Sequence, residues 1–266
     1  PFVQGKFNMG GTGVLKFCGK HGLQLIVSRR NPAILKNKSS HVTDSQWGFT
    51  IIRREDPEGN RRSSVYTYMA PLGAEKNPGK GGVLRFNAET MPIFPDGSSA
   101  YSRTSSWGTL IKLYEYSATG YKSHILRKDG ILGRIDLLLP DIALPMRLHE
   151  CRAYGGHAGS FDTTLTGIRV RLEDDKADNL EPDFPASAQM NIMGEEMMVT
   201  IYAFKKGRAD TYRKNEGIIF VVNGQTHGHF TTDFFTRKKA GGLSYLADSL
   251  LVCIDCSKLS GRSRED

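Results

Sequence analysis

Short apolar runs of strand length are the feature that most constrains the fold of this chain of 266 residues. They include residues 23–30 (LQLIVSRR), 46–55 (QWGFTIIRRE), 107–116 (WGTLIKLYEY) and 249–255 (SLLVCID), which are rich in β-branched or aromatic residues. Such residues favour strands, and the alternation within 107–116 indicates a strand with one buried face. No apolar run approaches the length that crosses a membrane, so we expect no membrane partner. The sequence therefore predicts a fold built mainly on sheets.

The first half of the chain contains further strand and loop signals. Residues 64–69 (SVYTYM) follow 46–55 after the turn-forming EDPEGNRR, which predicts a β-hairpin. Residues 71–82 and 87–106 are rich in Gly, Pro and Ser, so we predict loops on both sides of a short VLRF strand.

Residues 129–140 have apolar residues at the spacing of one face of a helix, so we predict a helix there. Asp129 opens it and Pro140 ends it, as expected for residues at helix ends. The apolar residues that recur at helical spacing are Ile131, Leu132, Ile135, Leu138 and Leu139.

The pattern changes near residue 153, where YGGHAGS predicts a flexible junction. The segments TLTGIRVRL, EEMMVTIYAFKKG, EGIIFVVNGQ and SLLVCID then predict three or four strands, with a loop at 173–188 and a helix in FTTDFFTRKK. Two domains are therefore predicted, 1–152 and 153–266, of α+β class.

The number and spacing of the cysteines indicate the cellular compartment and whether a metal site is expected. The chain has four cysteines, Cys18, Cys151, Cys253 and Cys256, too few and too scattered for a secreted disulfide framework. Because no signal-peptide pattern is present, we expect an intracellular protein, cytoplasmic or nuclear. The CIDC pair has the spacing of half a metal site, but on a strand its two thiols would point to opposite faces. We expect one buried and one outward thiol, and no metal site.

Residues 5–17, GKFNMGGTGVLKF, place four glycines directly before a helix-compatible segment. Glycine lets backbone N–H groups approach phosphate, and a helix N-terminus favours anions. The stretch does not match the dinucleotide fingerprint or the P-loop, whose spacings differ. The residues that we expect to contact phosphate are Asn8, Gly10, Gly11, Thr12 and Gly13.

Three segments in order resemble the GHKL ATPase superfamily, which includes gyrase B subunits, heat-shock chaperones of ninety kilodaltons, MutL proteins, histidine kinases and MORC ATPases. GKFNMGGTGVLKF resembles its glycine-rich ATP lid, and Gly108-Thr109 in GTLIKLYEY resembles the Gly-Thr strand near the adenine. EGIIFVVNGQTHGHFTTDFFTRK followed by SYLADSLLVCID resembles the transducer domain. The resemblance implies ATP and Mg2+ as cofactors. It also implies a Bergerat-type sandwich, with helices on one face of a mixed sheet, followed by a transducer-like domain.

The resemblance also shows which parts of the pocket have no counterpart here. The family uses a helix with a catalytic Glu and a Mg2+-binding Asn, then a D-x-G-x-G turn, and neither occurs in a suitable position. Since the chain begins at Pro1, we expect it to be a fragment that is inactive alone, from an ATPase. The family also implies a homodimer as one state of the full-length protein. A basic residue after the Ile-Asp strand is expected to contact the γ-phosphate, and the candidates are Lys258, Arg262 and Arg264.

A second function class stays open at this point. The net charge of +8 favours polyanionic partners, and a nucleic-acid-binding scaffold could use the basic pairs at 29–30, 53–54, 61–62 and 238–239. A hydrolase based on His149 or His157 ranks last, because no nucleophile elbow is present.

Overall fold

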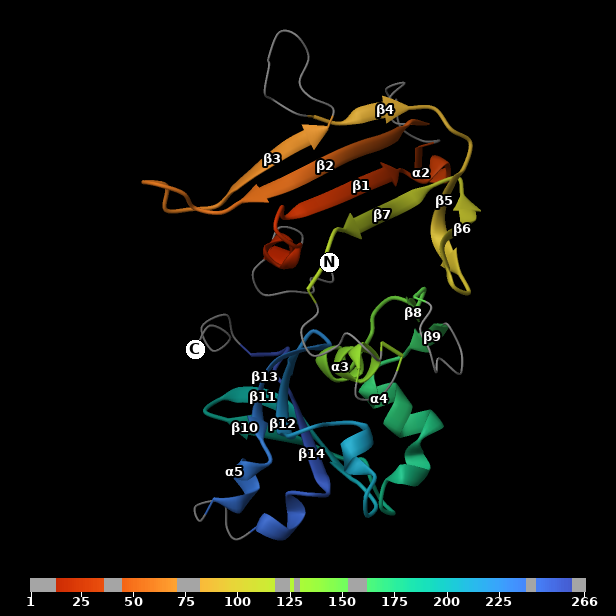
Figure 1. Cartoon of the computed structure of the whole chain (residues 1–266). Helices are drawn as coiled ribbons and strands as arrows, with labels where there is room; N and C mark the ends of the chain where they lie inside the picture. The colour runs from red at the N-terminus through yellow and green to blue at the C-terminus, as the bar shows by residue number, and fades with distance from the viewer. Residues whose placement is uncertain are drawn as a thin grey trace. The chain divides into compact units, whose positions relative to one another are not determined.

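The computed structural model describes residues 13–35, 45–70, 82–117, 125–126, 130–152, 162–237 and 243–259 (Figure 1). The described residues form two compact units. The N-terminal unit holds 13–117 with 151–152, and the C-terminal unit holds 125–150 and 162–259.

The N-terminal unit is built on an antiparallel sheet of order β3-β2-β1-β7 (Figure 1). β1 (Leu23–Arg29) lies between β2 (Trp47–Glu55) and β7 (Gly108–Leu113), and β3 (Val65–Ala70) and β4 (Leu84–Phe86) share the outer edge of β2. All five predicted strands and the β2–β3 hairpin are therefore confirmed. The helical segments described in this unit, η1 (Val14–Phe17) and α2 (Pro32–Leu35), have four residues each.

The predicted loop at 87–106 is wrong, because β5 (Met91–Asp96) and β6 (Ser99–Ser105) form a hairpin there. The hairpin contains two prolines and several serines. In a two-stranded ribbon each strand has an unpaired outer edge, so a proline can lie with its missing N–H on that edge without loss of an inter-strand hydrogen bond. Ile93 of β5 packs with Val27 and Trp47 in the core of this unit.

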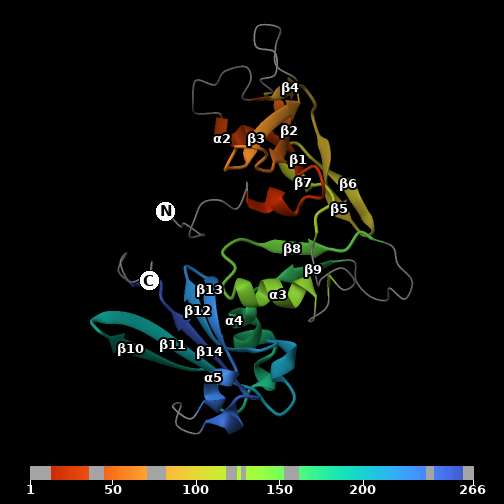
Figure 2. The same cartoon turned by 60° about the vertical axis from the view of Figure 1, so that its left-hand side comes forward.

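The C-terminal unit contains a five-stranded sheet of order β10-β11-β14-β12-β13 (Figure 2). Its strands are β10 (Ala186–Ile192), β11 (Glu195–Ala203), β12 (Glu216–Val222), β13 (Gln225–Thr231) and β14 (Leu250–Asp255). β12 and β14 are parallel, and every other neighbouring pair is antiparallel. Between β12 and β14 the chain makes β13 and the short helices α5 (Asp233–Thr236) and η7 (Ser244–Leu246).

Two expectations for 162–192 need correction. TLTGIRVRL is only partly a strand: β9 (Asp162–Leu165) ends early, and α4 (Ile168–Val170) continues as a π-helix to Asp175. The predicted loop at 173–188 contains the end of that helix, η4 (Ala177–Asn179) and the start of β10. The helix forms because Ile168 and Leu172, four residues apart, are both buried in the core of the sheet.

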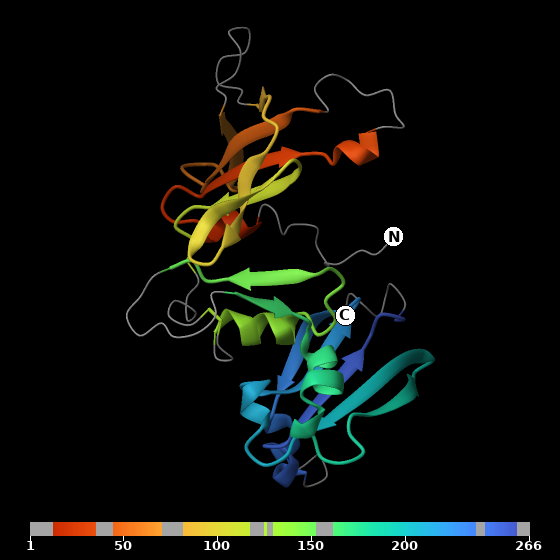
Figure 3. The same cartoon turned by 90° about the vertical axis from the view of Figure 1, so that its right-hand side faces the viewer.

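The helical stripe is confirmed as α3 (Ile131–Leu138), which ends before Pro140, while Asp129 lies outside the described residues. α3 packs in the C-terminal unit, near the β8 (Met146–His149) and β9 pair (Figure 3). Leu137 lies in the core of that unit, and Thr226 Oγ1 donates to Leu137 O at 2.8 Å. The chain passes from one compact unit to the other near residue 120, near 150 and near 162, and the boundary predicted from the sequence lies near 152.

The described chain is thus a strand-rich α+β protein, as the sequence predicted. The finer expectation of helices covering one face of the N-terminal sheet has no counterpart among the described residues of that unit, whose helical segments are single turns.

Candidate functional site

Of the residues predicted to contact phosphate, Asn8, Gly10, Gly11 and Thr12 lie outside the described part of the chain. Gly13 is described, with φ −60° and ψ −34°, a helical conformation that any residue can adopt. A Cβ at Gly13 would meet nothing within 4 Å, so the protein itself does not require glycine there. The helix that follows is a single 3-10 turn, so it offers backbone N–H donors but a weak helix dipole.

The Gly-Thr pair opens β7 beside the end of β1. Gly108 pairs with Arg29 and Thr109 with Ser28, and the two hydroxyl groups of Ser28 and Thr109 lie 2.7 Å apart. Gly108 has φ 134°, and a Cβ there would lie 3.1 Å from Ile93 Cδ1, so both backbone and space favour glycine.

Thr109 is exposed on the sheet face opposite the core. Val27 and Leu110 belong to the core of the N-terminal unit, so by alternation Ser28 and Thr109 point to the other face. Ile111, two residues after Thr109, shares that face and is 54% exposed. The face therefore presents hydroxyl groups next to apolar surface.

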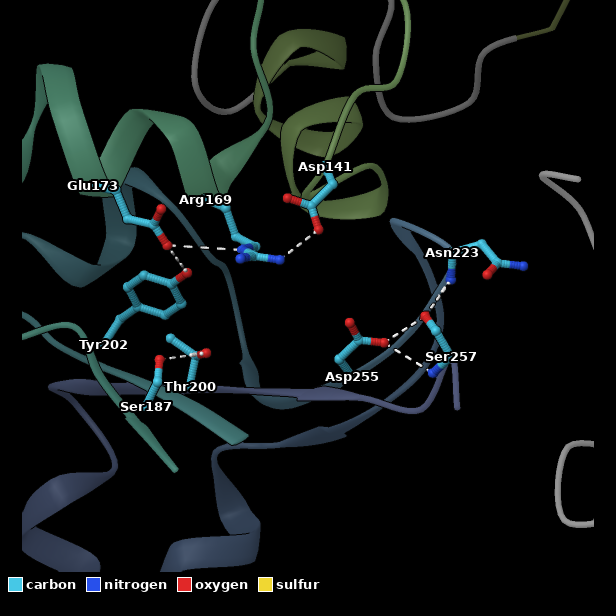
Figure 4. A network of polar contacts seen from close by, with 9 residues as sticks. All are labelled: Asp141, Arg169, Glu173, Ser187, Thr200, Tyr202, Asn223, Asp255 and Ser257. Atoms are coloured by element: carbon cyan, nitrogen blue, oxygen red, sulfur yellow. Dashed lines mark hydrogen bonds and ion pairs between the residues drawn. The ribbon is translucent and has the colours of Figure 1, made fainter. Parts of the chain in front are cut away.

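In the C-terminal unit, the loop after β14 is fixed at its base by the Asp255 carboxylate (Figure 4). Asp255 Oδ1 accepts hydrogen bonds from Ser257 N at 2.9 Å and from Ser257 Oγ at 2.5 Å. Ser257 Oγ in turn accepts from Asn223 N at 2.7 Å, and Cys256 N donates to Val221 O at 2.7 Å. The VNG turn and the loop after β14 are thus one rigid corner at the carboxyl ends of two parallel strands.

Arg169 on α4 lies near this corner and joins three elements (Figure 4). Its Nη1 donates to Asp141 Oδ2 at 2.8 Å, and its Nε lies 3.7 Å from Glu173 Oε1. Tyr202 Oη, from β11, lies 3.5 Å from the same Glu173 oxygen. Burial alone would lower the pKa of Arg169, but the nearby Asp141 carboxylate has the larger opposite effect. The pKa is therefore raised, and the guanidinium stays charged.

Two hollows flank Asp255. The first, of about 240 Å³, is lined by Arg169, Thr200, Cys253, Asp255 and Lys258 among others. The second, more open, is about 340 Å³ and is lined on its polar side by Asp141, Asn223, Asp255 and Ser257. The first hollow mixes charges of opposite sign, and the charged groups of the second are the two carboxylates Asp141 and Asp255, so both suit a polar ligand rather than an apolar one.

The three predicted γ-phosphate contacts have different outcomes. Lys258 is exposed, and its Nζ lies 3.6 Å from Glu196 Oε2. Arg262 and Arg264 lie outside the described residues. Arg169 and Asp255 do not stand out in the sequence, because the pattern around Arg169 predicts a strand and its partner Asp141 is 28 residues away.

Within the basic pairs at 53–54 and 61–62, three arginines have acidic partners in the N-terminal unit. Arg54 Nη1 lies 2.6 Å from Asp56 Oδ1, and Arg53 and Arg61 both pair with Glu55, at 3.9 and 3.6 Å. The 238–239 pair lies outside the described residues. This neutralisation weakens the case for a nucleic-acid surface at 53–62.

A comparison with models of known protein families finds no match to this chain, and a comparison with curated proteins finds none either. Among the described residues, no helix is long and apolar enough to span a membrane. Within the same residues, no group of three or more His, Cys, Asp or Glu side chains could hold a metal ion.

The expectation of one buried and one outward thiol in CIDC is wrong. Cys253 and Cys256 are both buried, because β14 ends at Asp255 and Cys256 turns back under β12. Burial raises the pKa of Cys253 to about 12 and also raises the pKa of Cys18 and Cys256.

We therefore expect a thiol reagent at about pH 8 to label the native protein at Cys151, which is half-buried, far faster than at the other three cysteines. A buried thiol with a raised pKa is both protonated and inaccessible. Mass spectrometry of the labelled peptides would measure this, and urea-unfolded protein, labelled at all four sites, is the control. Rapid native labelling of Cys253 would contradict its burial.

Proposed function

We propose that the chain carries the lid, the Gly-Thr strand and the transducer-like unit of an ATP-binding and ATP-hydrolysing conformational switch of the GHKL type. In this proposal the N-terminal unit is part of a Bergerat-type nucleotide domain. ATP binding closes the glycine-rich lid, and the second unit changes its conformation in response to this closure.

The observation that supports the proposal most is the pairing of β1 with β7. The glycine-rich segment leads through η1 into the start of β1, and Gly108-Thr109 pairs with the end of β1. From Leu23 to Ser28 the strand advances five residues, roughly 17 Å at 3.4 Å per residue. That separation is comparable to the length of an extended nucleoside triphosphate. The separation of the two ends of β1 supports a proposal in which the phosphates lie near its start and the adenine lies near Gly108-Thr109 at its end.

The chemistry of the two ends agrees with that assignment. Backbone N–H groups of the lid segment, together with Asn8 and Thr12, would donate to phosphate oxygens. The Thr109 and Ser28 hydroxyl groups can donate to or accept from adenine nitrogens, while Ile111 offers apolar surface to the ring. Hydrolysis additionally requires a base and Mg2+, for which the family uses residues without counterpart in this sequence.

The corner formed by Asp255, Ser257 and Asn223 supports a sensing role for the loop after β14. A loop that is fixed at its base can move a charge such as Lys258 over a short, defined path. We propose that Lys258, Arg262 or Arg264 contacts the γ-phosphate when the lid is closed. The Lys258–Glu196 pair, which is solvent-exposed and therefore weak, would break at small cost.

The direct test is equilibrium binding of ATP with Mg2+ to the protein. Binding that saturates at one site per chain supports the proposal, and absence of binding at millimolar ATP would overturn it.

Thr109→Val is expected to weaken ATP binding about tenfold, since it removes one hydrogen-bonding hydroxyl while keeping the side-chain shape. The matched control is Thr104→Val on β6, which is also an exposed strand position and should leave the Kd unchanged. Equal affinity of both variants would mean that Thr109 does not contact the nucleotide.

A further inference from the structure

β10 is an edge strand in which apolar and polar residues alternate, as in a half-buried strand, although all of its residues are exposed. Its sequence, ASAQMNI, alternates strictly, with Ala186, Ala188, Met190 and Ile192 on one face and polar side chains on the other. Such alternation is typical of a strand with one buried face. All seven residues are nevertheless exposed, and Met190 and Ile192 are 44% and 47% accessible.

The outer edge of β10 lacks the features that normally protect a sheet edge. The strand contains no charged residue, no proline and no bulge along its register with β11. Among the described elements only β11 pairs with it. The two strands are joined by a two-residue turn at Met193-Gly194, so Ile192 and Glu195 form the hydrogen-bonded pair next to the turn.

That geometry determines which backbone groups are available. Hydrogen-bonded and non-bonded pairs alternate along an antiparallel ladder. Counting from Ile192, the N–H and C=O groups of Ser187, Gln189 and Asn191 point away from β11. The edge therefore offers three evenly spaced donor and acceptor pairs, centred on Gln189.

We propose that a second copy of this chain pairs with this edge, β10 against β10, antiparallel about a two-fold axis at Gln189. In that register Gln189 faces Gln189 of the second copy, and Ser187 faces Asn191, so every outward backbone group finds a partner. Ala188 comes opposite Met190 and Ala186 opposite Ile192, which places a small side chain against each large one. No like charges meet, because the strand carries none.

The turn residue Met193 agrees with this arrangement. It has φ 55° and is 100% exposed, at a position where Asn or Gly would be less strained. A single copy gains no packing from this side chain. In the proposed register Met193 lies opposite Pro185 of the second copy, where its apolar side chain would be covered.

A second copy fits the edge better than an unrelated peptide does, because the same seven residues satisfy both sides of the ladder with matched sizes. The shared surface is short, so we expect a weak dimer, with a Kd in the micromolar range or above. The pairing would join two five-stranded sheets into one continuous sheet.

A charge exchange at Gln189 tests the register. Because Gln189 faces itself across the axis, Gln189→Lys and Gln189→Glu should each be monomeric in sedimentation velocity at concentrations where the natural chain dimerises. An equimolar mixture of the two variants should form a one-to-one heterodimer, since Lys then faces Glu. The charges lie on an exposed strand position, so the fold should be retained, which circular dichroism would verify.

The matched control is Gln225→Lys on β13, the strand at the other edge of the same sheet, which should dimerise like the natural chain. The proposal is overturned if the natural chain stays monomeric at about millimolar concentration, if either single-charge variant still dimerises, or if the mixture stays monomeric. All measurements are made without nucleotide, so their outcome is independent of ATP binding.

Discussion

Gly167→Ala is expected to destabilise the C-terminal unit by about 4 kcal/mol or more, enough to unfold much of it at room temperature. Gly167 precedes α4 with φ 85° and ψ 157°, a conformation that is nearly exclusive to glycine. A Cβ there would lie 2.3 Å from Pro140 O and 2.8 Å from Leu139 O, which are backbone atoms that cannot turn away. Urea unfolding followed by far-ultraviolet circular dichroism would measure the loss.

The matched control is Gly207→Ala in the same unit. Gly207 also has a positive φ, 74°, but a Cβ there would meet nothing within 4 Å. Only the conformational strain remains, which we expect to cost about 1 kcal/mol. If both variants lost the same stability, close packing of Gly167 against the 139–140 segment would not be the cause.

The position of Gly167 also matters for the candidate site. The backbone of Asp141 lies against Gly224, where a Cβ would come 2.7 Å from Asp141 O. Close approach at Gly167 and Gly224 together holds Asp141 where Arg169 can pair with it. A stabilising substitution elsewhere in the C-terminal unit would therefore not restore the Arg169–Asp141 ion pair in Gly167→Ala.

The strands that the sequence predicted are those with dense β-branched and aromatic residues. β1, β2, β7, β12 and β14 carry a local signal: β1, β2, β12 and β14 each bury at least one apolar side chain, and Leu110 of β7 packs partly buried against the core. Among the strands that were missed, β5, β6, β10 and β13 are rich in Ser, Pro, Gly, Asn or His. Pairing with an adjacent strand through a tight turn stabilises them, and single-residue preference does not report that pairing.

The site was predictable only where a motif is contiguous. Gly108-Thr109 is a candidate from the sequence because both residues stand together at the start of a strand, and the structure adds that Thr109 pairs with Ser28. Arg169 pairs with Asp141, 28 residues earlier, and Glu173 in turn contacts Tyr202 of β11, so these longer-range contacts are not indicated by any local pattern. α3 was correctly predicted as a helix, but its packing in the C-terminal unit could not be predicted, since amphipathicity gives the apolar face of a helix and not the surface that it packs against.

Glu216→Ala is the second change with a large expected effect, about 3 kcal/mol. Glu216 is buried at the start of β12, where Oε2 accepts from Lys214 N at 3.0 Å and Asn215 N at 3.2 Å. Its Oε1 pairs with Arg134 Nη1 of α3 at 2.5 Å. The substitution leaves two backbone donors and one guanidinium without their acceptor. The exposed Glu181→Ala, in the same unit, should change stability by less than about 0.5 kcal/mol.

The pH dependence of the free energy of unfolding shows how much of the stabilisation by Glu216 depends on its negative charge and how much on its hydrogen-bonding shape. Burial raises the pKa of this carboxyl, but the N–H of Lys214 and the Arg134 guanidinium outweigh it, so the pKa lies below its ordinary 4.5. A carboxyl with a lowered folded pKa contributes stability above its unfolded pKa and loses that contribution as pH falls through the folded value. The stability gap between the natural chain and Glu216→Gln should thus be full near neutral pH and shrink below 4.5. A gap of constant size from neutral to acid pH would show that the hydrogen-bonding shape of the side chain matters and its ionisation does not.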